Sequence, residues 1–99
     1  MSASVCGNVD HVAALLGAVR AASALLRSHS EDRWATWLDA DAERIASGDG
    51  YGVEHLLRAF GGMGSLNDVS LPNRADDDRL WSLRDVIWSN ARAIQRQRG

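Results

Sequence analysis

Apolar residues recur at α-helical spacing in four separate stretches of this chain. Spacings of three, four and seven residues place side chains on one face of a helix, and they occur at about residues 9–27, 30–46, 53–60 and 75–97. A glycine-rich loop at residues 61–72 separates the last two stretches, and weak alternation at Val69 and Leu71 allows a short extended segment there. The sequence therefore predicts an all-α fold, a compact bundle of four helices.

The length and charge of the chain limit the kinds of protein that it can be. Ninety-nine residues are enough for one domain with its own core, and we expect one helical domain over residues 1–99 with residues 1–7 flexible. The net charge of −2 argues against nucleic-acid binding, because such domains are usually strongly basic. No stretch approaches the roughly 18 apolar residues of a membrane span. The single cysteine, Cys6, excludes an intramolecular disulfide, so we expect a cytoplasmic protein without membrane contact.

Polar residues near the ends of the first two helices predict where these helices begin and end. Asn8 suits the N-cap of the first helix. Ser28 and Glu31 have capping-box spacing before the second helix, and Ser30 is a competing N-cap. Gly48 suits the C-terminal end of the second helix. The first helix is apolar on nearly all sides, so we expect it to pack against neighbours on two sides.

One carboxylate interrupts the apolar stripe of the second helix. Asp41 lies seven residues after Trp34 and four before Ile45, on the face that should be buried. A buried carboxylate needs a partner. Backbone N–H groups of the glycine-rich loop are the expected donors, and Asp41 is therefore predicted to be structural.

The glycine-rich loop invites comparison with a phosphate cradle. Gly61, Gly62 and Gly64 follow the end of a helix, whereas phosphate loops precede a helix start. The chain contains no lysine to complete a P-loop. We therefore interpret these glycines as a structural corner. A small-ligand or anion site, even an enzymatic one, remains an alternative, and its residues would be Ser65, Asn67 and Asp68 with a nearby arginine, Arg58 or Arg74.

Metal-binding and catalytic patterns are weak. The metal-ligand candidates are spaced neither as helical pairs nor as a CxxC motif, and they are Cys6, His11, His29 and His55. Nucleophilic catalysis needs a base next to a cysteine or serine, and no such arrangement is visible in the sequence. We expect no metal, no cofactor and no catalytic residue.

Four tryptophans are many for a chain of this length. Trp34 and Trp37 lie on the apolar stripe of the second helix and are expected in the core. Trp81 and Trp88 lie on the flank of the last helix with Arg84 between them, which makes the three residues candidates for a partner interface. Core packing is the alternative for these two tryptophans. The unusually wide apolar face also predicts a homodimer.

Three stretches resemble a known family. They are "RWATWL", "IASGDGYGVEHLLRAFGGMGSLNDVSL" and the asparagine before the last helix, and they span about residues 31–95. They resemble a family of small, uncharacterised bacterial helical domains, and "FGGMGSLND" is the most specific part of the match. The resemblance implies a soluble, mostly helical bacterial domain and carries over no activity.

The expected function is a non-enzymatic protein-binding or regulatory module. The acidic segment at residues 31–49 would suit a basic partner. A toxin-neutralising immunity protein is a further alternative, by analogy with other small bacterial domains. An exposed tryptophan–arginine patch on the last helix without a deep pocket would favour protein binding, whereas polar loop residues converging with an arginine in a concave pocket would favour a ligand.

Overall fold

Four helices make up the fold. The computed structural model describes residues 3–49, 51–60, 66 and 69–98, with side chains between residues 11 and 97 of these ranges. The helices are α1 (Ala3–Ser28), α2 (Asp32–Ala46), α3 (Tyr51–Arg58) and α4 (Arg74–Arg98). Within the described ranges there is no β-strand, so the part of the loop at Val69 to Leu71 is irregular. The predicted all-α bundle of four helices is confirmed.

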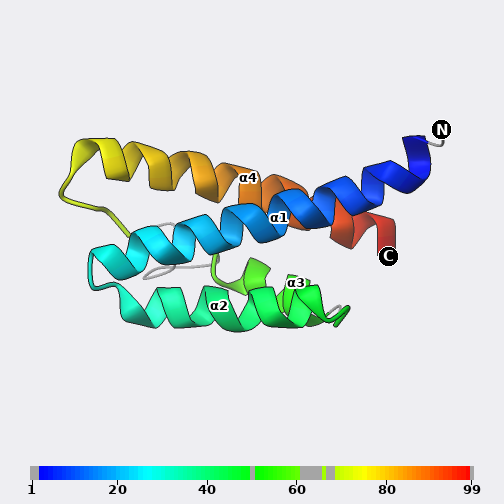
Figure 1. Ribbon diagram of the computed structural model, residues 1–99, viewed down its shortest axis with the longest axis horizontal. Coiled ribbons are helices and arrows are strands. Elements are labelled where there is room, and N and C mark those ends of the chain that lie inside the picture. The colour runs from blue at the N-terminus through cyan, green and yellow to red at the C-terminus, as the bar shows by residue number, and fades with distance from the viewer. Residues whose placement is uncertain (1–2, 50, 61–65, 67–68, 99) are drawn as a thin grey trace.

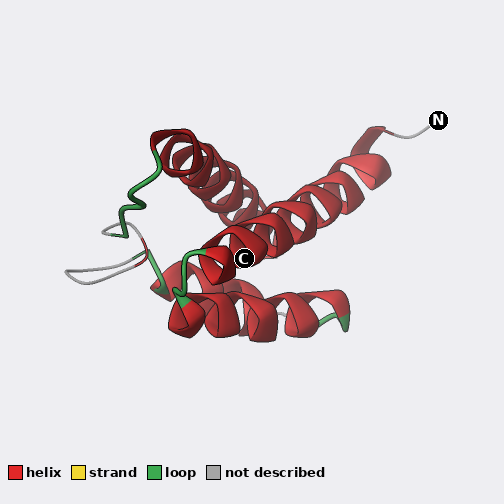
Figure 2. Ribbon diagram, turned by 60° about the vertical axis from the view of Figure 1, so that its left-hand side comes forward, coloured by secondary structure: helices red, strands yellow, loops and turns green. Residues whose placement is uncertain are grey.

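The long helix α1 lies between two others. α2 and α4 both pack against α1 and run antiparallel to it, while the short α3 contacts α2 and α4 (Figure 1). Figure 2 shows α2 and α4 on different sides of α1. The side chains of α1 serve both contacts, with Leu15, Val19 and Leu26 fully buried alongside the small Ala18 and Ala22. The expectation that this helix packs on two sides is confirmed.

The core also reaches the loop before α4. Leu66 is fully buried and its N–H donates to the carbonyl of Ala59 at 2.7 Å. Leu71 is buried as well. These leucines join the larger core residues of the helices, which include Leu38, Ile45, Leu56, Leu80 and Ile87. The described part of the loop is therefore anchored to the bundle by its apolar side chains.

Helix α1 begins earlier than the sequence suggests. It starts at Ala3, so Asn8 lies within the helix and the predicted N-cap is wrong. Extending a formed helix adds one backbone hydrogen bond for each residue that is fixed, which can outweigh the low helix propensity of asparagine.

Among the helices of the described residues, none combines the length and the apolar character needed to cross a bilayer.

The turn between α1 and α2 is closed by backbone bonds and not by a serine cap. The N–H groups of Glu31 and Ser30 donate to the carbonyls of Leu26 and Arg27 at 2.9 and 3.1 Å, with Ser30 at a positive φ of 63°. This is a Schellman motif, which satisfies the end of α1. Glu31 takes the N-cap position of α2 without a side-chain bond, so both predicted serine caps are wrong. The serines could have capped the start of α2 or taken part in the turn that ends α1. The structure shows the second arrangement, the Schellman motif at the end of α1.

Glycines close the contact between α2 and α3. Gly48 has a φ of 86° and donates to the carbonyl of Ile45 at 3.1 Å, which confirms its role at the end of α2. In the first turn of α3, a Cβ on Gly52 would lie 2.9 Å from the Cβ of Arg44. Only glycine allows this approach. The first turn of α3 is thereby pressed onto the last turns of α2.

An asparagine side chain caps the start of α4. Asn73 Oδ1 accepts a hydrogen bond from the N–H of Asp76 at 3.0 Å, which is an N-cap bond. Asp76 and Asp77 lie in the first turn, where the helix dipole favours negative charge. Asp77 Oδ1 also accepts from the N–H of Leu71 at 2.9 Å. The helix start therefore fixes the end of the preceding loop.

Candidate functional site

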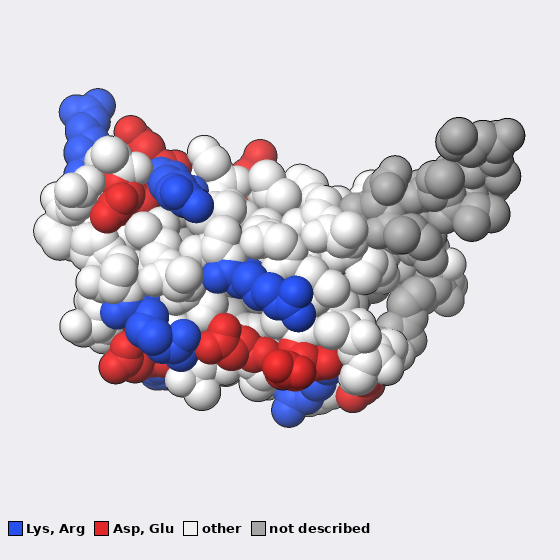
Figure 3. Space-filling model, in the orientation of Figure 1, with Lys and Arg blue, Asp and Glu red and all other residues white. Residues whose placement is uncertain are grey.

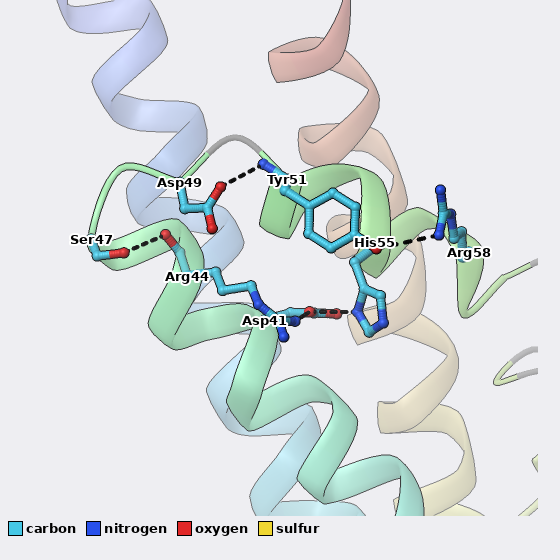
Figure 4. A network of polar contacts seen from close by, with 7 residues as sticks. All are labelled: Asp41, Arg44, Ser47, Asp49, Tyr51, His55 and Arg58. Carbon is cyan, nitrogen blue, oxygen red and sulfur yellow. Dashed lines mark hydrogen bonds and ion pairs between the residues drawn. The ribbon is translucent and has the colours of Figure 1, made fainter.

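A buried carboxylate joins α2 to α3. Asp41 has no exposed surface, and its Oδ1 accepts hydrogen bonds from His55 Nδ1 at 2.7 Å and from Arg44 Nη1 at 3.0 Å (Figure 4). Arg44 comes from the same helix, three residues on, and His55 comes from α3. The predicted burial of Asp41 is confirmed. The partners that the structure shows are side chains, whereas the glycines expected to supply N–H groups lie outside the described residues.

Burial controls the charge of Asp41. Loss of water around the carboxyl group raises its pKa above the ordinary value, and the hydrogen bonds and charges of His55 and Arg44 oppose this rise. Within the described part of the chain no donor reaches Asp41 Oδ2, so half of the carboxylate has no hydrogen bond to offset its desolvation.

Aromatic rings hold the imidazole of His55. It stacks on Trp37 with ring centroids 4.4 Å apart and an interplanar angle of 19°, and Tyr51 approaches to 5.8 Å. The guanidinium groups of Arg44 and Arg58 lie 5.9 and 5.7 Å from the Tyr51 ring. Arg58 also donates to the Tyr51 hydroxyl at 3.4 Å (Figure 4). Together these side chains form a polar and aromatic layer between α2 and α3.

This layer fixes one imidazole in place. A carboxylate that accepts from Nδ1–H sets the tautomer of a histidine, as in many acid–base sites. Among the described residues, however, Asp41 is the only hydrogen-bond partner of His55, and no serine or threonine hydroxyl bonds to its ring. The physical effect of the arrangement is therefore to bind α3 to α2.

The tryptophans divide between core and surface. Trp34 is buried and Trp37 is half-buried, whereas Trp81 and Trp88 of α4 are 57 % and 42 % exposed. Both surface tryptophans are held in place, because Trp88 lies 5.5 Å from Phe60 and Trp81 lies 4.3 Å from a guanidinium. The proposed partner interface of these two residues stays a prediction.

Arg84 lies under the surface tryptophans and is not exposed beside them. It is 2 % exposed, and its Nη1 donates to the carbonyls of Leu66 and Val69 at 2.7 and 2.9 Å. Its guanidinium is the group that packs against Trp81. The expectation that Arg84 forms part of an exposed patch is wrong, because its guanidinium turns inward and donates to loop carbonyls that need hydrogen-bond partners when buried. Arg84 fixes the loop and supports Trp81 from below.

A surface groove runs beside these tryptophans. Its volume is about 400 Å³, and it is lined by Phe60, Trp81, Arg84, Asp85 and Trp88. We call this the α4 groove. The sequence did not single out Phe60 or Asp85. Asp85 was detectable in principle, because it lies four residues after Trp81 and three before Trp88 on the same face of the helix.

A family model for a domain of unknown function, DUF6966, matches residues 27–78 of the chain. This is more than half of its length. The chain belongs to the DUF6966 family. No curated protein and no solved structure matched the chain. The resemblance to an uncharacterised domain family is therefore confirmed, while bacterial origin stays an expectation.

The family match covers one of the two sites. Asp41 and His55 lie within the matched residues of this DUF6966 domain, whereas the tryptophans of the α4 groove lie beyond them. The layer between α2 and α3 is thus part of the matched family domain. The α4 groove is built largely on the helix that continues past that domain.

Two further histidines contact α4 of this DUF6966 protein. His11 bonds to Asn90 at 2.8 Å, which links α1 to α4. His29 Nε2 lies 2.8 Å from a carboxylate oxygen of Asp76. In the part of the chain that the structure describes, no three His, Cys, Asp or Glu side chains are grouped as a metal site would need.

Most residues of the predicted loop site fall outside the described part of the chain. Gly61, Gly62, Gly64, Ser65, Asn67 and Asp68 lie outside the described residues. Arg58 is described, and it is exposed on α3 next to Tyr51. The anion site at residues 61–68 therefore stays a prediction.

The acidic segment is partly neutralised within the fold. At residues 31–49, Asp39 pairs with Arg27 at 3.0 Å and Asp41 with Arg44. In the face shown in Figure 3, acidic and basic side chains lie close together over α2 and over the start of α4. This face carries mixed charge and not a field of one sign, so the expected attraction of a basic partner to residues 31–49 stays a prediction.

Proposed function

We propose that this DUF6966 protein is a non-enzymatic protein-binding module whose partner docks on the α4 groove. One observation carries the proposal. Within the described residues, four large apolar side chains are exposed, and two of them, Trp81 and Trp88, line this groove on α4. Exposed tryptophans concentrated on one helix are typical of a binding surface.

The shape of the groove supports binding without large rearrangement. Trp88 rests against Phe60, and Trp81 rests on the buried guanidinium of Arg84. Arg84 is in turn held by two backbone carbonyls. Side chains that are already ordered lose little conformational entropy when a partner arrives. The two tryptophans are therefore suited to act as anchors.

The other distinctive cluster favours a structural role. His55 is held by Asp41 and stacked on Trp37, with its one hydrogen bond in the described chain directed inward to a buried carboxylate. A general base needs a reacting group within hydrogen-bond reach. The described residues supply no such nucleophile, so the cluster supports a binding protein better than a hydrolase or transferase.

Photo-crosslinking in the native host tests the proposal. Trp81 is replaced by p-benzoylphenylalanine in one variant, and Tyr51 is replaced in a matched control, since Tyr51 is also an exposed aromatic but lies on α3. Crosslinked products are identified by mass spectrometry. We expect a defined protein adduct, either a second copy or another protein, from position 81 and none from position 51. No adduct from position 81, or equal adducts from both positions, would overturn the proposal.

Binding measurements then give the size of the effect. With the purified adduct partner, Trp81→Ala and Trp88→Ala should each weaken binding by about 30-fold, as expected for hot-spot residues. Tyr51→Ala should leave the affinity unchanged. Equal affinity of all variants would contradict the role of the groove.

A further inference from the structure

We infer that the partner on the α4 groove is a second copy of this chain, bound with the two α4 helices antiparallel. This inference rests on the proposed function and names the partner. It is carried by the order of aromatic and charged side chains on the exposed face of α4.

The exposed face of α4 forms one continuous stripe. Trp81, Asp85, Trp88, Arg92 and Arg96 are all exposed, and their spacings are four, three, four and four residues. At about 100° per residue these five side chains lie within an arc of roughly 80°. We call them the α4 stripe. Such a stripe along a straight helix suits contact with another helix.

The charged side chains of the α4 stripe, Asp85, Arg92 and Arg96, have no ion-pair partner among the described residues. Arg92 lies 5.6 Å from the Trp88 ring and donates to Gln95 at 3.1 Å. The carboxylate comes early on the stripe and the arginines come late, so the stripe has a charge direction.

An antiparallel pair of stripes is complementary to itself. With the two-fold axis between Trp88 and Ser89, Asp85 faces Arg92 of the second copy, and the same contact repeats on the other side of the axis. Trp81 then faces Arg96 of the second copy, which is a favourable cation–π arrangement. The two Trp88 side chains meet at the axis. All five members of the stripe thus gain a partner from one symmetric contact.

The parallel arrangement is unfavourable. It would place Asp85 opposite Asp85 and Arg92 opposite Arg92, and like charges that face each other across an interface weaken it. An unrelated partner would need to present an arginine, an aromatic side chain and a carboxylate in the matching order along one helix. The second copy already carries this order, which is why it is the occupant that fits best.

Charge reversal tests the contact by sedimentation velocity on the full chain over a wide concentration range. We expect wild type to form a dimer, and Asp85→Arg and Arg92→Asp each to raise the dimer dissociation constant by at least about 10-fold. The double variant should return to within about 3-fold of wild type, because both pairs are restored in reversed order. Glu43→Arg, on the exposed side of α2, should leave the constant unchanged.

Disulfide trapping tests the orientation in a Cys6→Ser background. Ser89→Cys places a thiol next to the axis in both copies and should give a covalent dimer. Ser82→Cys is the matched control. It lies about six and a half residues, or about 10 Å, from the axis along the helix, so two copies would be about 20 Å apart in the antiparallel pair. A disulfide needs Cα atoms within about 7 Å. Efficient trapping through Ser82→Cys would overturn the antiparallel orientation.

The outcomes separate this inference from the proposed function. A strict monomer up to about 1 mM would overturn the second copy as partner. If position 81 then still crosslinks to a different protein, the proposed function stands. In one outcome, the double variant fails to restore the dimer while Trp88→Ala still raises the dissociation constant of the otherwise wild-type dimer. That result would overturn the antiparallel pairing alone. Unchanged thermal unfolding of each variant shows that a lost dimer does not result from a lost fold.

Discussion

Two aspartates on α2 show how position decides the behaviour of the same side chain. Asp39 faces α1, where it accepts hydrogen bonds from Ser23 Oγ at 2.6 Å and from Arg27 at 3.0 Å. Asp41 faces α3 and accepts from His55 and Arg44. The two carboxylates are only two residues apart, which at about 100° per residue turns them to different sides of the helix.

The pKa values of these two groups move in opposite directions. The hydrogen bond from Ser23 has the largest effect and lowers the pKa of Asp39. Burial raises this pKa by less than Ser23 lowers it, and the hydrogen bond and charge of Arg27 lower it further. Desolvation raises the pKa of Asp41 although two side chains donate to it. Asp39 keeps 47 % of its side chain exposed, whereas Asp41 keeps none. Water, and not the number of partners, makes the difference.

Replacing each aspartate by alanine should give the largest difference in stability between the two positions. Asp41→Ala removes the acceptor of two partners and leaves a cavity, so the free energy of unfolding should fall by about 2–3 kcal/mol. Asp39→Ala breaks a largely exposed pair and should cost about 0–1 kcal/mol. Urea denaturation of both variants measures the difference. Equal losses would mean that burial does not govern the two contacts.

The contributions of the two aspartates to folding stability should depend on pH with opposite signs. The raised pKa of Asp41 gives a contribution to stability that is complete below the unfolded-state pKa of about 3.9 and is lost as pH rises through the folded-state pKa. The lowered pKa of Asp39 gives a contribution that is present above that unfolded-state pKa and is lost as pH falls through the folded-state pKa.

The matched variants for this experiment are Asp41→Asn and Asp39→Asn, with unfolding measured from pH 7 to about pH 3. On acidification, wild type should gain stability relative to Asp41→Asn, mainly above about pH 4. Over the lower part of the range, it should lose stability relative to Asp39→Asn. The difference in unfolding free energy between wild type and each Asn variant should change with pH in opposite directions. A change in the same direction for both variants would contradict the opposite pKa shifts of Asp39 and Asp41.

The last prediction concerns the hydroxyl that donates to Asp39, and its expected effect is smaller than that of Asp41→Ala. Ser23 is 2 % exposed and donates the short bond to Asp39. Ser23→Ala should lower the free energy of unfolding by about 1 kcal/mol and bring the pKa of Asp39 back toward its ordinary value. Carboxyl chemical shifts followed through an NMR titration measure this pKa. An unchanged, still lowered pKa would show that Arg27 alone determines it.

Part of this pattern could be predicted from the sequence. The position of Asp41 in an apolar helical stripe predicts its burial, and the flank position of Trp81 and Trp88 makes them surface candidates. The pairing of Asp41 with His55 could not be predicted, because it depends on how α3 packs on α2. The inward course of Arg84 also depends on loop carbonyls brought near by the fold.

The sequence by itself determined the helices and their buried faces, because apolar periodicity and a glycine at a helix end act over a few residues. The tertiary structure alone decided the distant partners of the buried charges. Asp41 pairs with His55 and Arg84 with two loop carbonyls, all from segments 14 or more residues away. Such contacts depend on how helices pack and how far long side chains reach, and no local pattern records either quantity.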